Sequence, residues 1–149
     1  MKKVLIVLFV VLGYSVNAQT IDYNTTKGYV VEGYDVVSYF SNTAKEGSDK
    51  YVATHDGAKY KFSSQENLDL FNANQTKYVP QYGGYCAYAL GTKNKKVAVD
   101  PETFEIRGGK LYLFYNSWGS NALKLWLNES PNELLVKADK NWEKLKQKK

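Results

Sequence analysis

The sequence predicts an α+β fold, in which small antiparallel β-hairpins pack with short helices and a helical extension ends the chain. The turn pairs Asp56-Gly57 and Gly108-Gly109 each lie between β-branched and aromatic residues, a pattern typical of hairpins. Helix-capping signals at Ser63 and Ser130 precede apolar residues spaced along one helix face. A length of 149 residues, with 44% apolar and 23% charged residues, fits a single globular domain.

The first eighteen residues have the pattern of a secretory signal peptide. Two lysines precede an apolar run at residues 4–12, and residues 16–18 supply the small side chains that a signal peptidase requires. Nine apolar residues are too few for a membrane span, which needs roughly twenty. We therefore expect cleavage before Gln19 and an exported domain of residues 19–149, periplasmic or extracellular, with no stable membrane anchor.

Short strands are expected in the first half of the mature chain. Residues 29–31 and 36–40 are rich in β-branched and aromatic side chains and are flanked by glycine or asparagine. Residues 51–55 and 58–63 predict a hairpin around Asp56-Gly57, because this pair readily adopts the positive φ angles of a type I′ turn.

A helix is predicted to follow this hairpin. Ser63 and Glu66 have the spacing of a capping box, and residues 72–76 are typical of a helix end. Residues 79–91 combine small residues and tyrosines without a clear period, which predicts a loop leading into a short helix or strand.

The last third of the chain predicts a second hairpin and two helices. Residues 104–107 and 110–115 form the hairpin arms, and residues 118–127 carry apolar side chains on one side of a helix. Ser130 and Pro131 then mark the start of the final helix, since proline is favoured at the first helical position.

The composition excludes several classes of function. One cysteine, one histidine and a single arginine stand against thirteen tyrosines. These counts exclude a four-cysteine zinc site, a disulfide framework and a two-histidine metal motif. Without the two leader lysines, 18 basic side chains face 15 acidic ones, a net charge of +3, and much of the excess lies in the C-terminal lysines. We therefore expect no nucleic-acid partner.

Several segments together resemble a known family. The residues that carry the resemblance are 33–40, 55–64, 66–67, 71, 77–80, 81–88, 99–101, 109–113 and 138–142. They are similar to the exported YHS-domain proteins, also described as YHS domain-containing (seleno)proteins, from about Gly28 to Trp142. The wider group is related to the TRASH domains and includes heavy-metal-binding modules of copper-transporting ATPases. The resemblance implies a YHS-like fold for residues 19–149.

The cysteines of those metal-binding relatives are absent here. In the relatives, D-P-V-C-G-M pairs with a later Y-x-F-C-S-x-x-C, and thiolates suit soft metals. In this chain Ser38, Ser63 and Asn67 stand where the resemblance places cysteines, and the namesake histidine is Lys61. The fold is therefore expected to carry over without the thiolate site.

Cys86 is the main candidate for a catalytic residue. An unpaired cysteine in an oxidising compartment is buried, bonded to another molecule or kept for its reactivity. The resemblance suggests that Cys86 lies where some family members have selenocysteine, which implies peroxide or thiol redox chemistry. A substrate would then approach the thiol over Gly83 and Gly84, which lack β-carbons. The alternative is a small buried apolar side chain.

Metal handling and simple binding remain as further interpretations. Cys86 and His55 are candidate ligands of a transition metal such as copper or zinc, completed by Asp35, Asp100 or Glu102. Alternatively, the chain is a non-catalytic module that binds a small molecule or a periplasmic protein on a tyrosine-rich surface. The residues of that ligand pocket would be Tyr82, Gly83, Gly84, Tyr85 and Tyr88. A scaffold without any site is the third interpretation.

Overall fold

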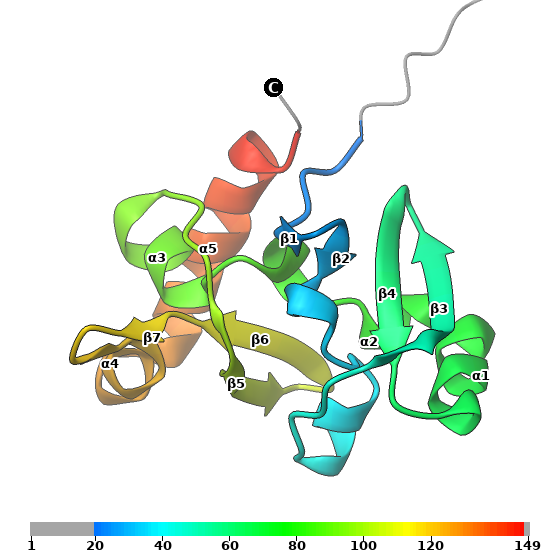
Figure 1. The fold of residues 1–149 in the computed structure, drawn as a ribbon. Coiled ribbons are helices and arrows are strands. Elements are labelled where there is room, and N and C mark those ends of the chain that lie inside the picture. The colour runs from blue at the N-terminus through cyan, green and yellow to red at the C-terminus, as the bar shows by residue number, and fades with distance from the viewer. Residues whose placement is uncertain (1–19, 148–149) are drawn as a thin grey trace, which may run out of the picture.

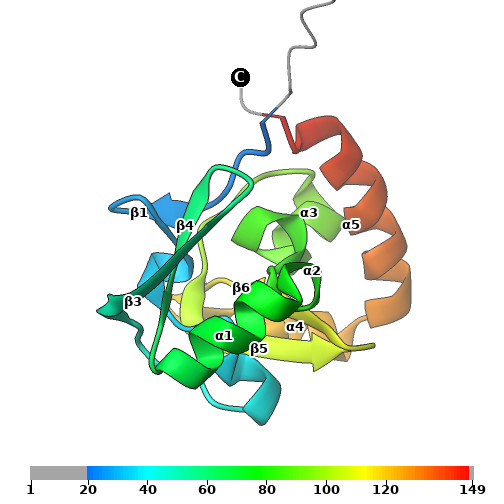
Figure 2. The same cartoon turned by 90° about the vertical axis from the view of Figure 1, so that its right-hand side faces the viewer.

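The computed structural model describes residues 20–147, and it is a mixed α+β fold. Figure 1 shows strands on both sides of the molecule with helices packed around them, and Figure 2 shows α5 (Pro131–Leu145) along one edge. The predicted leader, residues 1–18, lies outside the described residues. Within residues 20–147, no helix combines the length and the apolar content needed to cross a membrane.

The first sheet contains four strands in the order β1-β2-β4-β3. The strands are β1 (Thr25–Thr26), β2 (Tyr29–Val30), β3 (Ser48–His55) and β4 (Ala58–Phe62). The predicted first hairpin is confirmed, because β3 and β4 pair antiparallel around Asp56 and Gly57, whose φ angles are 50° and 77°. The first strand pairs antiparallel with β2, and β2 pairs in parallel with β4. The expected strand at residues 29–31 therefore ends one residue early, where η1 (Val31–Gly33) begins.

The strand expected at residues 36–40 is wrong. This segment is a turn that leads into the short 3-10 helix η2 (Ser38–Ser41). The carboxylate of Asp35 accepts hydrogen bonds from the backbone N–H groups of Val37, at 2.9 Å, and Ser38, at 3.3 Å. These bonds fold the backbone back on itself and commit donors that a strand would use for its neighbour.

The first α-helix starts one residue later than predicted. In α1 (Gln65–Ala73) the cap is Ser64, whose hydroxyl accepts a hydrogen bond from the backbone N–H of Asn67 at 3.1 Å. The side chain of Ser63 is bonded to Asp35 instead. A short helix, α2 (Gln75–Tyr78), follows directly.

The loop predicted at residues 79–91 contains two helical segments. The 3-10 segment η3 (Gln81–Gly84) turns through positive φ angles, and α3 (Ala87–Lys93) begins immediately after Cys86. The expectation of a loop leading into a short helix is therefore confirmed.

The second hairpin is also confirmed, with β5 (Asp100–Arg107) and β6 (Lys110–Phe114) paired antiparallel around two glycines. The start predicted for the helix at residues 118–127 is wrong, because the helix begins only at Ala122. Trp118 and Gly119 instead form the turn of a small hairpin, β7 (Asn116–Ser117) and β8 (Ser120–Asn121). The helix α4 (Ala122–Asn128) starts after Asn121, whose side chain accepts the N–H of Lys124 at 3.0 Å.

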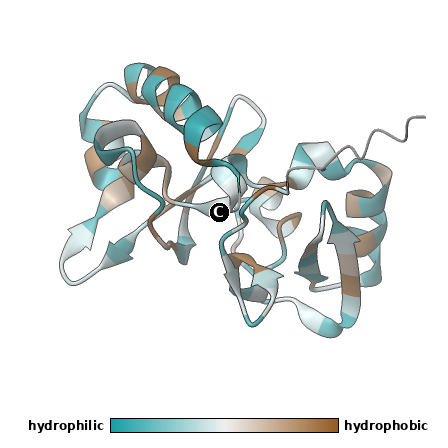
Figure 3. Ribbon diagram, turned by 90° about the horizontal axis from the view of Figure 1, so that it is seen from above, coloured by the Kyte–Doolittle hydropathy of each residue, from teal (hydrophilic) through white to brown (hydrophobic). Residues whose placement is uncertain are grey.

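The final helix, α5, begins with Pro131 as predicted, although the Ser130 side chain makes no capping hydrogen bond. Leu134 and Ala138 bury its inner face, and its hydrophilic and hydrophobic residues are both visible in Figure 3. It packs beside α3, as Figures 1 and 2 show, and Gly91 allows this approach. A β-carbon at Gly91 would lie 2.9 Å from the backbone oxygen of Leu134.

The buried hydrophobic side chains of the described residues form one cluster. Its centre is β6, whose residues 111–114 are all buried, with Trp126 of α4 against them. Aromatic rings supply much of this core. The largest fully buried ones are Trp126, Tyr39, Tyr60, Phe62, Phe71 and Phe114.

Candidate functional site

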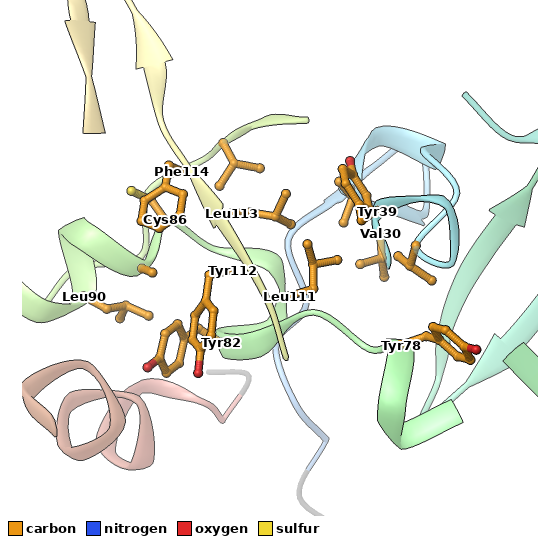
Figure 4. Close-up of a cluster of buried hydrophobic side chains, with 14 of the residues drawn as sticks. Val30, Tyr39, Tyr78, Tyr82, Cys86, Leu90, Leu111, Tyr112, Leu113 and Phe114 are labelled. Carbon is orange, nitrogen blue, oxygen red and sulfur yellow. The ribbon is translucent and has the colours of Figure 1, made fainter. Parts of the chain in front are cut away.

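Cys86 lies in the core rather than at the surface. Its exposed fraction is 0%, and it is drawn in Figure 4 beside Phe114 and Leu113. The backbone of Cys86 forms a parallel bridge with Leu113 and donates its N–H to the carbonyl of Val97 at 2.9 Å. The sulfur accepts the backbone N–H of Tyr115 at 3.3 Å. Backbone contacts on both sides therefore fix this thiol within the fold.

The environment of Cys86 favours the protonated thiol. Burial raises the pKa of the thiol above its ordinary value. The N–H of Tyr115 and the charge of Lys93 act in the opposite direction, but burial is the larger effect. A reactive cysteine needs a lowered pKa and access to solvent, and Cys86 has neither.

The space beside Gly83 and Gly84 is filled by other residues of the protein. A β-carbon on Gly83 would lie 2.9 Å from the backbone oxygen of Asp22 and 3.0 Å from the indole ring of Trp142. Gly84 has φ +83° and is covered by Val30 and neighbouring apolar side chains. The expected substrate path over Gly83 is wrong, because Asp22 and Trp142 occupy that space.

His55 and Cys86 belong to different parts of the fold. His55 ends β3, where its Nδ1 lies 2.8 Å from Oε1 of Gln75 and its ring packs edge-on against Phe71. Cys86 immediately precedes α3, and α3 and β3 lie on opposite sides of the molecule in Figure 1. Over the part of the chain that the structure describes, no group of three or more His, Cys, Asp or Glu side chains could hold a metal ion.

One of the carboxylates proposed to complete a metal site, that of Asp100, is occupied by hydrogen bonds. Asp100 accepts the Thr103 hydroxyl at 2.8 Å and the Asn116 amide at 3.2 Å. It also accepts the backbone N–H of Glu102 at 3.0 Å. These bonds organise the start of β5.

Each tyrosine near Cys86 directs its hydroxyl to a carboxylate. Tyr82 donates to Asp139 at 2.8 Å, Tyr85 donates to Asp22 at 3.3 Å, and Tyr88 donates to Glu129 at 2.7 Å. The hydrogen bond to Glu129, with burial, raises the pKa of Tyr88 to about 12. Burial also raises the pKa values of Tyr82 and Tyr85. All three hydroxyls are therefore protonated donors at neutral pH.

The expected ligand pocket is divided between two cavities. Tyr82 and Gly83 line the first, which we call the aromatic pocket: a volume of about 520 Å³ between the N-terminal segment, η3 and α5. Tyr23 and Trp142 also line it, and the rings of Tyr82 and Trp142 are 6.3 Å apart. Tyr88 lines a smaller pocket of about 290 Å³ with Cys86. Tyr85 and Gly84 line neither of these cavities.

A buried polar cluster around Asp35 is the feature that sequence reasoning missed as a site. Asp35 has an exposed fraction of 0%, and its Oδ2 accepts the backbone N–H of Ser63 at 2.8 Å, the Ser63 hydroxyl at 2.7 Å and the Asn67 amide at 2.7 Å. The Ser38 hydroxyl donates to the Asp35 carbonyl at 2.7 Å. These four residues, which we call the Asp35 cluster, include all three positions that the family resemblance equates with cysteines. The sequence signal that could have identified this cluster is that polar residues stand at all three of these positions.

Comparison of the chain with family models, with curated proteins and with solved structures finds no match.

Proposed function

We propose that this chain is an exported YHS-like domain that acts as a non-catalytic binding module for a small molecule, held in the aromatic pocket. The observation that carries the proposal is the separation of that pocket from the thiol. The pocket is open and lined by Tyr23, Tyr82 and Trp142, whereas Cys86 is buried and lies outside it. Open pockets with aromatic walls and a few polar groups are typical of small-molecule sites.

The Asp35 cluster supports the family part of this proposal. Ser38 lies in η2, whereas Ser63 and Asn67 lie at the start of α1, and the side chains of all three reach Asp35. A YHS-like fold is expected to gather these positions, because they hold a shared metal ion in the cysteine-containing relatives. With hydroxyls and an amide in place of thiolates, the cluster lacks the ligands that soft metals prefer.

The lining of the aromatic pocket indicates the kind of molecule that would fit. The rings of Tyr82 and Trp142 offer apolar surface, and planar ligands stack favourably on such rings. Charged residues of both signs surround them: Lys110, Lys140, Asp139 and Glu143. Because these charges balance, we expect a planar ligand without a large net charge. One oxygen of the Asp139 carboxylate accepts the Tyr82 hydroxyl, and the carboxylate can accept a further hydrogen bond from the ligand.

The proposal is tested by native mass spectrometry of the protein purified after secretion from its source cells. We expect a small molecule to co-purify and to be lost in Tyr23→Ala and Trp142→Ala variants. Tyr88→Ala is the matched control, because that tyrosine also bonds a carboxylate but lies outside the aromatic pocket. Cys86→Ala should also retain the molecule.

A second arm separates binding from catalysis. Peroxide consumption by the purified protein should be no faster than that of the Cys86→Ala variant. A cysteine-dependent turnover, or a bound molecule that the Tyr23 and Trp142 variants retain unchanged, would contradict the proposal.

A further inference from the structure

A second cavity lies over the Asp35 cluster, and it shares no lining residue with the aromatic pocket. Its volume is about 570 Å³, and it is bounded by η2, the first turn of α1 and α2. We call it the η2–α1 pocket. The polar residues important to its chemistry are Ser38, Thr43, Ser63, Asn67, Lys45 and Lys77.

Three of the hydroxyl groups that line this pocket donate their hydrogens to other groups of the protein. Ser38 donates to the Asp35 carbonyl at 2.7 Å, and Ser63 donates to the Asp35 carboxylate at 2.7 Å. Thr43 donates to the carbonyl of Ser41 at 3.2 Å. Because a hydroxyl has one hydrogen, each of these oxygens can only accept a bond from a ligand.

Asn67 extends this acceptor surface. Its amide nitrogen donates to Asp35 at 2.7 Å and approaches the Ser63 oxygen at 3.5 Å, which leaves its carbonyl oxygen as an acceptor. Asp35 places a buried carboxylate directly behind these groups. A floor of acceptors backed by a carboxylate favours a ligand group that carries several hydrogens and a positive charge, such as an ammonium group.

The rim of the pocket has the opposite character. Lys45 and Lys77 are exposed, and among residues 20–147 no carboxylate lies within ion-pair distance of either ammonium. The Lys77 ammonium lies 4.9 Å from the ring centre of Tyr78 and 5.9 Å from that of Phe40, so it is held against the pocket wall. Glu66 is the one acidic residue of the lining, and it is exposed on the first turn of α1.

One wall of the pocket is apolar. It is formed by Val37, Phe40, Leu70 and Tyr78, and the rings of Phe40 and Tyr78 pack edge-to-face at 5.1 Å. A ligand that contacts the floor and the rim therefore also has an apolar surface within the same cavity.

We propose that the η2–α1 pocket binds a small zwitterion of the α-amino-acid class with an apolar side chain. The ammonium group contacts the acceptor floor at Ser38, Ser63 and Asn67, and the carboxylate contacts Lys45 and Lys77. The side chain lies against the apolar wall. This site is independent of the aromatic pocket and does not rest on the function proposed there.

The proposal is tested by isothermal titration of the full mature chain with L-leucine. Two related probes each lack one charged group: 3-methylbutylamine has no carboxylate, and 4-methylpentanoate has no ammonium. We expect saturable binding of L-leucine and at least about tenfold weaker binding of each related probe, since one charged contact contributes about a factor of ten. No heat from L-leucine, or equal affinity for either probe, would overturn the proposal.

Variants locate the site. Lys45→Ala combined with Lys77→Ala should weaken L-leucine binding about tenfold, whereas the exposed control Lys95→Ala should leave it unchanged. All three lysines are exposed, so folding should be retained, and circular dichroism checks this directly. Tyr23→Ala should leave L-leucine binding unchanged, which separates this site from the aromatic pocket. Binding that survives in the double lysine variant would contradict the assignment.

Discussion

Asp35 and Cys86 are both fully buried, and they show how differently the fold treats two polar groups. The Asp35 carboxylate accepts five hydrogen bonds, from three backbone N–H groups and from the side chains of Ser63 and Asn67. The Cys86 sulfur accepts one, from Tyr115, and its pKa is raised by burial. Partners of Asp35 line the η2–α1 pocket, whereas Cys86 has an exposed fraction of 0% and lies at the edge of the smaller pocket that it shares with Tyr88.

The difference teaches that rarity in the sequence is a poor guide to chemistry. The single cysteine stands out by count, but its surroundings resemble those of a buried apolar side chain. An aspartate is common by count, yet this one organises two distant segments and orients the groups of a candidate site. The environment of a side chain, more than its type, decides what it can do.

The largest expected effect is on Asp35. Asp35→Ala leaves its donors buried without an acceptor, and we expect a loss of about 3–5 kcal/mol in the free energy of unfolding. Urea denaturation measures this loss. Asp69→Ala, at an exposed position of α1, is the control and should change stability by less than about 0.5 kcal/mol. A loss below about 1 kcal/mol for Asp35→Ala would show that the cluster does not hold the segments together.

A smaller loss is expected at Gly83, beside Cys86. Gly83→Ala places a β-carbon against the Asp22 backbone and the Trp142 ring at a φ of +61°, and should cost about 2–3 kcal/mol. Gly109→Ala is a matched control, because its φ is +72° but no atom lies within 4 Å of the added carbon. Its cost should be about 1 kcal/mol. Equal losses in thermal or urea unfolding would mean that packing does not close the space above Gly83.

The smallest effect is expected at the thiol itself. Cys86→Ala removes one buried sulfur and should cost about 1 kcal/mol, because the remaining cavity is small. Binding in the aromatic pocket should not change, since Cys86 does not line it. The comparison between the two buried groups fails if Cys86→Ala destabilises the protein as much as Asp35→Ala in the same urea titration.

The elements that the sequence predicts well depend on neighbouring residues. Asp56-Gly57 and Gly108-Gly109 set their hairpins through local turn geometry, and Pro131 marks the start of α5. The strand expected at residues 36–40 is wrong because the Asp35 carboxylate accepts the backbone N–H groups of Val37 and Ser38 and turns the chain there. The same carboxylate also bonds groups 28 and 32 residues away, and no local pattern reports those contacts. The same long-range bonds explain why the cap of α1 is Ser64.

The candidate site was predictable in part. The resemblance identified Ser38, Ser63 and Asn67 as related positions, but their meeting at Asp35 depends on the packing of η2 against α1. The tyrosines around Cys86 were grouped by sequence proximity. In the fold, the turn at η3 directs Tyr82 and Tyr88 into different cavities, because Tyr82 and Gly83 both have positive φ angles.

The most direct test of the central claim is the rate at which Cys86 reacts with a thiol reagent such as 5,5′-dithiobis(2-nitrobenzoate). In the native protein at neutral pH, the account predicts almost no labelling, because the thiol is buried and protonated. Labelling should become rapid only in denaturant, and its denaturant dependence should follow global unfolding. Rapid labelling of the folded protein, with a pH midpoint below about 8.5, would instead identify a reactive thiol and contradict the account.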